Sequence, residues 1–219
     1  MRRSSGVTAT GIDNDPEDPT LAAPVEFYFD FASPYGYLAA TQVDELASRH
    51  GRDVVWRPIL LGAAFKVTGS QPSAAQPLRG DYLRHDVVRF ARLLGVPLAF
   101  PPGMPIAALA PSRAYWWLFE RDADAARRLA RVLYDAHWGQ GRDIADSEAV
   151  AGIAAAHGID AAAMRAGMQD PAVKQRLRKE TDAALARGVF GAPFIFVDGE
   201  AFWGAVRLPQ VDRWLAGGW

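Results

Sequence analysis

The sequence contains no cysteine among its 219 residues. This absence excludes disulfide bonds, zinc sites with thiolate ligands, iron–sulfur clusters and a cysteine nucleophile. Any thiol chemistry carried out by this protein must therefore use a sulfur atom that arrives on a ligand. The same absence fits a reducing compartment, and we expect a cytoplasmic location.

Two further features are missing, a basic excess and a long hydrophobic run. Lys and Arg total 24 while Asp and Glu total 25, so the formal net charge is −1. Binding to nucleic acid or to an anionic membrane surface requires an excess of positive charge. The apolar run near the C-terminus, residues 189–197, is interrupted by Gly191 and Pro193, and no stretch approaches the ~20 residues of a membrane-spanning helix. We therefore expect neither a nucleic acid nor a membrane as a partner.

The composition that is present, 50% hydrophobic and 22% charged, is that of a soluble globular protein. Residues 1–24 are rich in Thr, Asp, Pro and Gly and are predicted to form a disordered tail. No apolar segment follows the basic residues at the start, so no secretory signal is predicted. His, Asp and Glu show no metal-ligand spacing, so no metal site is predicted.

Residues 25–64 show the pattern of a strand, a helix and a second strand. The aromatic and β-branched run 25–30 predicts a strand. Ser33 and Pro34 are favoured at a helix start, and the apolar spacing predicts one helix that ends at Gly51. Residues 53–61 predict a second strand that runs into a loop. A strand, helix and strand in this order imply a parallel pair with a right-handed crossover.

The middle of the chain, residues 65–187, shows no convincing strand. Apolar stripes bounded by proline, glycine and aspartate predict helices near 83–94, 111–119, 129–136, 147–157 and 170–187.

The last segment returns to strands. Asp198 and Gly199 lie between the apolar runs 194–197 and 201–203, which is a strong hairpin signal, and residues 208–215 predict a closing amphipathic helix. The predicted class is α/β: a thioredoxin-like βαβ–ββα sheet in residues 25–64 and 188–219, with an inserted all-helical domain at 65–187.

Ser33 is the first candidate for chemistry. As a helix N-cap it stabilises the fold by about 1 kcal/mol, which is the favoured explanation from its position alone. The same position allows its hydroxyl to donate a hydrogen bond to an anion such as a thiolate, and both roles are compatible. A catalytic triad is not predicted, because no Gly-x-Ser-x-Gly turn surrounds Ser33. The histidines fall in predicted helices: His50, His85, His137 and His157.

Pro193 precedes a predicted strand. Because only about 5–6% of X-Pro bonds in folded proteins are cis, the residues alone predict a trans Ala192–Pro193 bond.

Four motifs together resemble the 2-hydroxychromene-2-carboxylate isomerases, which are relatives of kappa-class glutathione transferases in the DsbA-like thioredoxin-fold group. They cover about residues 25–216 in the order of that family. The motifs are residues 27–37 (FYFDFASPYGY), 57–62 (RPILLG) with 68–69 (TG), 138 with 141–144 (W and GRDI), and 188–193 (GVFGAP) with 198–200 (DGE) and 202–204 (FWG).

The resemblance implies that bound glutathione supplies the missing sulfur, and that Ser33 is the catalytic residue that holds it as a thiolate. In this family the thiolate adds to the conjugated substrate, a formerly double bond rotates, and elimination regenerates glutathione, which therefore acts as a cofactor. The matching proline of the family is cis. The backbone of the preceding residue, here Ala192, pairs with the cysteinyl unit of glutathione. Because relatives are often dimers, the resemblance also allows a homodimer.

The other implied glutathione contacts are Arg79, Ser70, Ala205 and Val206. Arg79 matches a basic residue that meets a glutathione carboxylate, although it also fits a solvated loop charge. Ser70 stands where the family usually has Asn. At Ala205 and Val206 the family usually has a polar residue and then Asp, which pairs with the γ-glutamyl amine. Loss of that charged hydrogen bond costs about 1.5–3 kcal/mol, or roughly ten- to a hundred-fold in affinity.

The candidate substrate contacts are aromatic and basic. Tyr35, Tyr82 and Trp203 are placed to stack on an aromatic ring, with core packing as the alternative and the favoured explanation for Trp203. Lys66 and Arg84 are candidates for a substrate carboxylate, with plain surface charge as the alternative.

These observations lead to one main hypothesis and two alternatives. The main hypothesis is a glutathione-dependent isomerase of a small aromatic or bicyclic 2-oxo or hemiketal carboxylate. The first alternative is a kappa-like transferase that conjugates glutathione to an electrophile. The second is a DsbA-like binding module that has lost glutathione, which Val206 favours.

Overall fold

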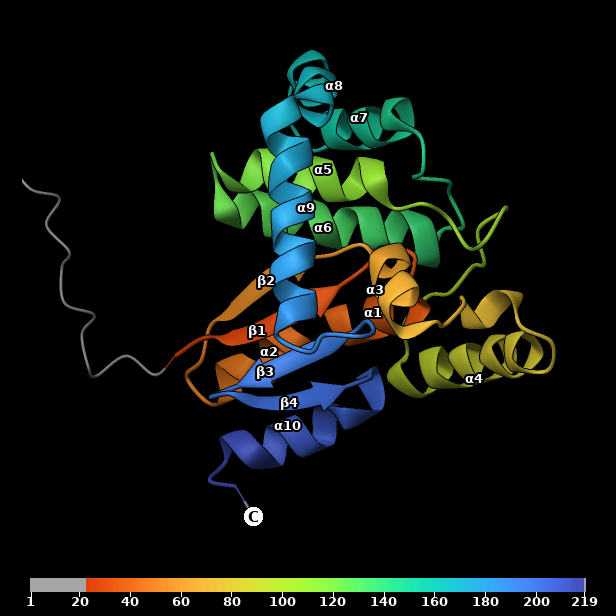
Figure 1. Ribbon diagram of the computed structural model, residues 1–219, viewed down its shortest axis with the longest axis vertical. Coiled ribbons are helices and arrows are strands. Elements are labelled where there is room, and N and C mark those ends of the chain that lie inside the picture. Colours follow the sequence, from red (N-terminus) through yellow and green to blue (C-terminus); the bar gives the residue numbers. More distant parts are fainter. Residues whose placement is uncertain (1–22, 219) are drawn as a thin grey trace, which may run out of the picture.

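The computed structural model describes residues 23–218. Most of the predicted tail, residues 1–22, lies outside this range. A four-stranded mixed sheet forms the centre, with strand order β2-β1-β3-β4 (Figure 1). The strands are β1 (Val25–Phe29), β2 (Val54–Pro58), β3 (Phe194–Val197) and β4 (Glu200–Trp203). β1 pairs in parallel with β2 and antiparallel with β3, so the predicted thioredoxin-like topology is confirmed.

Ten α-helices are described between residues 23 and 218. They are α1 (Pro34–Ala40), α2 (Val43–Arg49), α3 (Leu61–Thr68), α4 (Arg79–Leu94), α5 (Leu109–Phe119), α6 (Ala123–Tyr134), α7 (Ser147–Ala156), α8 (Ala161–Gln169), α9 (Pro171–Ala186) and α10 (Leu208–Leu215). Three short turns accompany them: η1 (Ser73–Ala75), the π-turn η2 (Asp135–Gly139) and η3 (Ala205–Arg207). In the described part of the chain, no helix is long and apolar enough to cross a membrane.

The two faces of the sheet have separate apolar clusters, because successive strand residues point to opposite faces. Phe27 and Phe29 of β1 belong to a large core that continues into the helical segment. Tyr28 lies on the other face with Phe194 and Phe196, under residues at the C-terminal end of α9. The helical segment and the sheet therefore share one large core. In Figure 1, α5 to α8 lie above the sheet, α10 lies below it, and α9 runs down toward β3.

Three local predictions differ from the structure. The helix expected to run from residue 33 to 51 is two helices, α1 and α2, with a break at Thr41 and Gln42. Both side chains donate hydrogen bonds to the carbonyl oxygen of Leu38, which competes with the helical pattern. The second strand ends at Pro58, and helix α3 follows where the sequence predicted a loop. Helix α8 was not predicted as a separate element.

The hairpin prediction is confirmed. Asp198 and Gly199 both have positive φ, 52° and 88°, as a tight turn between β3 and β4 requires. This turn sends β4 back along β3 and leads the chain into η3, beside the first residues of α1. As a result, the segments that begin and end the sheet meet at one edge of a large cavity.

Candidate active site

Ser33 is fixed at the junction of β1 and α1. Its N–H donates to the carbonyl oxygen of Asp30 at 2.9 Å, which closes the turn between the strand and the helix. Its side-chain oxygen accepts the N–H of Gly36 at 3.1 Å, and Pro34 is the first helical residue. The N-cap role predicted from the sequence is therefore confirmed.

The Ser33 hydroxyl also contacts the distant segment before β3. It donates a hydrogen bond of 2.9 Å to the carbonyl oxygen of Ala192. The Ala192–Pro193 peptide bond is cis. The trans bond expected from residue statistics is therefore wrong, and the cis bond implied by the resemblance is confirmed. Within the described residues, the N–H of Ala192 makes no backbone hydrogen bond, so this peptide offers an open donor beside Ser33.

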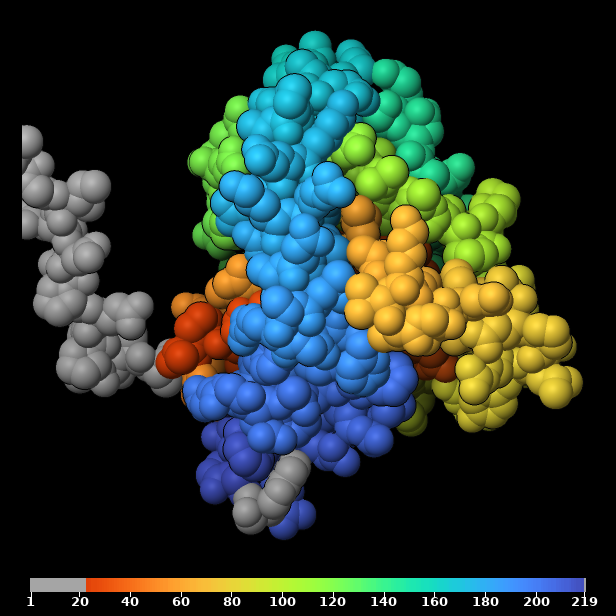
Figure 2. Space-filling view, viewed as in Figure 1, coloured from red at the N-terminus to blue at the C-terminus, as the bar shows by residue number. Residues whose placement is uncertain are grey.

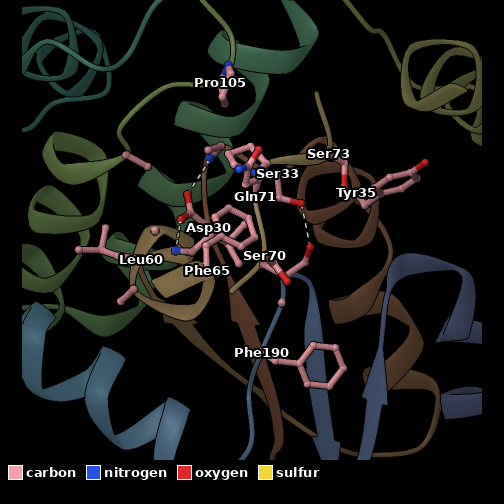
Figure 3. Close-up of a pocket in the computed structure, with 18 of the residues that line it drawn as sticks. Asp30, Ser33, Tyr35, Leu60, Phe65, Ser70, Gln71, Ser73, Pro105 and Phe190 are labelled. Carbon is pink, nitrogen blue, oxygen red and sulfur yellow. Dashed lines mark hydrogen bonds between the residues drawn. The ribbon is translucent and has the colours of Figure 1, made fainter. Parts of the chain in front are cut away.

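Ser33 and Ala192 line one open cavity of about 2020 Å³. Its walls come from the β1–α1 junction, α3 and the segment after it, the loop before α5, α9, and the β3–β4–η3 region. Figure 3 shows Asp30 and Ser33 near the centre of the view, with Phe190 below them. Figure 2 shows the orange and yellow segment of residues 60–80 beside α9 at this face of the molecule.

The cavity brings together all the predicted site residues except Tyr82 and Arg84. Those that line it are Ser33, Tyr35, Lys66, Ser70, Arg79, Ala192, Pro193, Trp203, Ala205 and Val206. Tyr82 is 62% exposed and lines a smaller neighbouring depression. Arg84 lies outside the cavity, with its guanidinium 5.4 Å from the ring centre of Phe100.

Trp203 is not a core residue, contrary to the favoured expectation. It is 54% exposed, and its ring centre lies 4.7 Å from that of Phe190 at the cavity wall. Its position in β4 places it next to Gly191, where a Cβ atom would lie 2.4 Å from the indole nitrogen. The absence of a side chain at Gly191 therefore allows the Trp203 ring to lie against the segment that carries Ala192.

Asp30 is a buried carboxyl group at the base of the site to which no sequence pattern pointed. It is only 3% exposed, and its two side-chain oxygens accept the N–H groups of Ala32 and Leu61 at 2.8 and 2.7 Å. Burial raises the pKa of Asp30 to about 6, and the two backbone hydrogen bonds oppose this shift. Asp30 thereby joins the Ser33 turn to the first residue of α3.

Tyr35 is held toward α4. Its hydroxyl donates to Asp86 at 2.6 Å, and Arg89 pairs with the same carboxylate. Burial, followed by the hydrogen bond to Asp86, raises the pKa of Tyr35 above its ordinary value. Tyr35 is therefore neutral at physiological pH, and its proton is already engaged. This geometry favours an aromatic wall over a proton donor.

Comparison with known proteins places these features in a family. The model of the DsbA-like thioredoxin domain matches residues 24–216. The chain is 34% identical to the 2-hydroxychromene-2-carboxylate isomerase of Sphingobium xenophagum, over 87% of this chain and 97% of that protein. It is 24% identical to human glutathione S-transferase kappa 1, over 91% and 93% of the two chains.

A solved structure shows the same relationship in three dimensions. A 2-hydroxychromene-2-carboxylate isomerase structure has a TM-score of 0.80 and 28% identity, and the match covers 88% of this chain and 94% of that one. The chain therefore belongs to the DsbA-like thioredoxin family and, within it, to the family of the 2-hydroxychromene-2-carboxylate isomerases.

Proposed function

We propose that this protein is a glutathione-dependent isomerase that acts on a small aromatic or bicyclic 2-oxo or hemiketal carboxylate. The observation that carries the proposal is the Ser33 hydroxyl beside the cis Ala192–Pro193 peptide in one large cavity. The chain has no sulfur nucleophile of its own, since it has no cysteine. The names of the family members support isomerisation as the reaction.

The thiol end of glutathione fits the residues that are present. An extended peptide can pair with the open N–H of Ala192, as peptides do when they add to a sheet edge. The Ser33 hydroxyl lies 2.9 Å from the carbonyl oxygen of the same residue, so a sulfur atom paired at this point would lie within its reach. Arg79, at the first turn of α4, is exposed and lines the cavity, so its charge is available to a carboxylate.

The amino end of glutathione has a weaker partner. Val206 is 56% exposed at the cavity wall, where the resemblance implies a carboxylate. Residues 205–207 supply no negative charge of their own. We therefore expect glutathione to bind, with an affinity reduced by the loss of this one ion pair.

When bound, glutathione would supply a thiolate that adds reversibly to a conjugated carbon, so that a double bond becomes a rotatable single bond. The Ser33 hydroxyl stabilises negative charge on the sulfur by donating its single proton to it instead of to Ala192. Phe190, Trp203 and Tyr35 line the cavity with aromatic rings on which a flat substrate ring can stack.

Two measurements test this proposal. Isothermal calorimetry with reduced glutathione should show binding, and no heat at millimolar ligand with folded protein would contradict the cofactor assignment. Product analysis with a 2-hydroxychromene-2-carboxylate should show isomerisation while total glutathione stays constant.

A transferase is the second candidate, favoured by the similarity to the kappa-class enzyme. The same Ser33 site would serve it, and the two reactions differ in their glutathione balance. Conjugation consumes glutathione in proportion to product, whereas isomerisation returns it. A binding module without glutathione is the third candidate, favoured by Val206, and it predicts no heat in the calorimetric titration. A homodimer, a cytoplasmic location and a role in the breakdown of aromatic compounds stay predictions.

A further inference from the structure

The cavity has a second, cationic part that the proposed glutathione contacts do not use. Arg113 of α5 and Lys174 and Arg178 of α9 all line it, and α5 packs against α9. The chain as a whole carries a formal charge of −1, so this is a local concentration of positive charge. Asp182 of α9 is also a lining residue, so the three cations outnumber the acid of these two helices. An excess of one sign of charge in a cleft attracts ligands of the opposite sign.

The position of these residues along α9 separates them from Ala192. The Thr181 hydroxyl accepts a hydrogen bond of 3.3 Å from the N–H of Leu60, and the next N–H, of Leu61, is bound by Asp30. Thr181 therefore marks the point along α9 that lies beside the base of the cavity. From there α9 continues through Leu185 toward the Ala192 segment, while Arg178 and Lys174 lie in the opposite direction. Lys174 and Leu185 both line the cavity, and they are about 16 Å apart along the helix axis. The cationic part is therefore the end of the cavity away from Ala192.

Arg113 is an unusual arginine in this protein. Its Nε is buried without a hydrogen-bond partner, and no ion pair or hydrogen bond engages its side chain within residues 23–218. The Nε atoms of Arg57 and Arg176 also lack a hydrogen-bond partner, but both guanidinium groups form ion pairs with carboxylates, which Arg113 does not within the described residues. Buried polar groups normally have partners, and an orphaned one often marks a place for a water or a ligand.

The carboxylates that line the cavity do not neutralise Arg113. Asp86 is engaged by Tyr35 and Arg89, and Asp30 accepts two backbone N–H groups. Asp182 of α9 also lines the cavity, but it forms no ion pair with Arg113 or Arg178 in the described part of the chain. Arg178 also has no ion pair in the described part of the chain. A guanidinium with free donors matches a carboxylate in planar, two-pronged geometry.

We propose that Arg113, with positive charge from Arg178 and Lys174, binds the carboxylate of the compound that is isomerised. The inference rests on the proposed function, because it assigns the Ser33 end of the cavity to glutathione and the α5–α9 end to the substrate. The volume leaves room for two ligands: the open cavity of about 2020 Å³ exceeds the roughly 300–1,000 Å³ of a typical pocket for one small molecule. This assignment replaces Arg84, which lies outside the cavity, and ranks Arg113 above the exposed Lys66 of α3.

The test uses two enones that differ in one group. Benzylidenepyruvate carries a carboxylate where benzylideneacetone carries a methyl group. Their binding is measured by tryptophan fluorescence at low salt and without glutathione. We expect the wild-type protein to bind benzylidenepyruvate at least about tenfold more tightly, and Arg113→Met to lose about ten- to a hundred-fold for this ligand only. Benzylideneacetone should bind both proteins equally.

Lys179→Met is the matched control, because Lys179 is an exposed cation on α9 that does not line the cavity. It should keep the full preference for the carboxylate. If Arg113→Met binds both enones as the wild type does, or if Lys179→Met loses the preference equally, the subsite is overturned. Should Arg113→Met fail to fold by circular dichroism, Arg113→Gln gives the same readout with a neutral polar side chain.

A glutathione titration on the same samples separates the two claims. Absence of glutathione binding together with a carboxylate preference that depends on Arg113 would contradict the proposed function and support the subsite. Glutathione binding without a carboxylate preference would support the function and overturn the subsite.

Discussion

The Ser33 hydroxyl donates its proton to the carbonyl oxygen of Ala192 at 2.9 Å, across 159 positions of sequence. Its oxygen is simultaneously an acceptor for the N–H of Gly36. A serine hydroxyl has only one proton to donate, so an incoming thiolate must compete with Ala192 for it. A charged acceptor makes the stronger hydrogen bond, which directs the hydroxyl to the sulfur when the ligand is bound.

Ser33→Ala should raise the pKa of the bound glutathione thiol toward the value of a free thiol, near 8.5. The reason is that the hydroxyl that stabilises the thiolate is lost. Ultraviolet absorbance of the thiolate as a function of pH measures this change. The lost N-cap should also lower the free energy of unfolding by about 1 kcal/mol.

Thr41→Ala is the control for Ser33→Ala. Ser33 precedes helix α1 and Thr41 directly follows it. Thr41 is exposed, and its hydroxyl donates to the carbonyl oxygen of Leu38, away from the cavity. It should leave the thiol pKa unchanged. An unchanged thiol pKa in Ser33→Ala itself would contradict the role of this hydroxyl.

Val206→Asp should tighten glutathione binding by about ten- to a hundred-fold, because it restores a carboxylate for the γ-glutamyl amine. Calorimetry measures the affinity, and Val206→Asn controls for shape without charge. Val206 is 56% exposed, so a polar side chain there should not disturb the core. Equal affinities of the Asp and Asn variants would show that the amine is held elsewhere or not at all.

Asp30 should make the protein less stable as the pH rises from about 4 to 6. Its pKa is raised from 3.8 to about 6, so the folded state keeps a proton that the unfolded chain releases. The stability from this group is fully present below the unfolded pKa and is lost as the pH passes the folded pKa, by about 3 kcal/mol in total.

Asp30→Asn isolates this effect, because the amide does not titrate. Urea titrations measure the free energy of unfolding of both proteins. Between pH 4 and 7 the wild type should lose about 3 kcal/mol of this free energy relative to the variant. Other carboxyl groups with lowered pKa values, such as Glu26 and Asp198, cancel in the comparison. A constant difference would show that Asp30 titrates normally.

Gly191→Ala should change substrate affinity with little effect on stability, whereas Gly167→Ala should lower stability. A Cβ at Gly191 would meet the exposed indole of Trp203, which can swing away, so substrate affinity should change while stability changes little. A Cβ at Gly167 would lie 2.2 Å from the buried ring of Trp117, which cannot yield without repacking. We expect that variant to lose about 1–3 kcal/mol in thermal or urea unfolding. Equal losses in both variants would contradict the mobility assigned to Trp203.

The fold was predictable where the signals are local. Pro171 with Asp170 marks the start of α9, and Asp198 with Gly199 marks the hairpin turn. The sequence signals failed where residues far apart in the chain determine the local structure. Helix α3 has no capping side chain of its own at Leu60, and its first N–H is bound instead by Asp30, which lies 31 positions earlier.

The candidate site was predictable in part for the same reason. Ser33 is visible as a helix start, and the family motifs around it and Pro193 directed attention to their contact. Trp203 was expected in the core because nothing in its neighbourhood shows that Gly191 opens a place for its ring at the cavity. No sequence pattern pointed to Arg113, because a single arginine in an apolar helix can be assigned a role only when the structure shows α9 packed beside that helix.

The pairing of β1 with β3 has a consequence for synthesis on the ribosome. β1 and β2 emerge early and can pair, but the other edge of β1 stays uncovered until residues 194–197 have left the exit tunnel. During that interval the nascent chain exposes an unsatisfied strand edge, a template for association with other chains. Protein truncated before β3 should therefore accumulate as insoluble material.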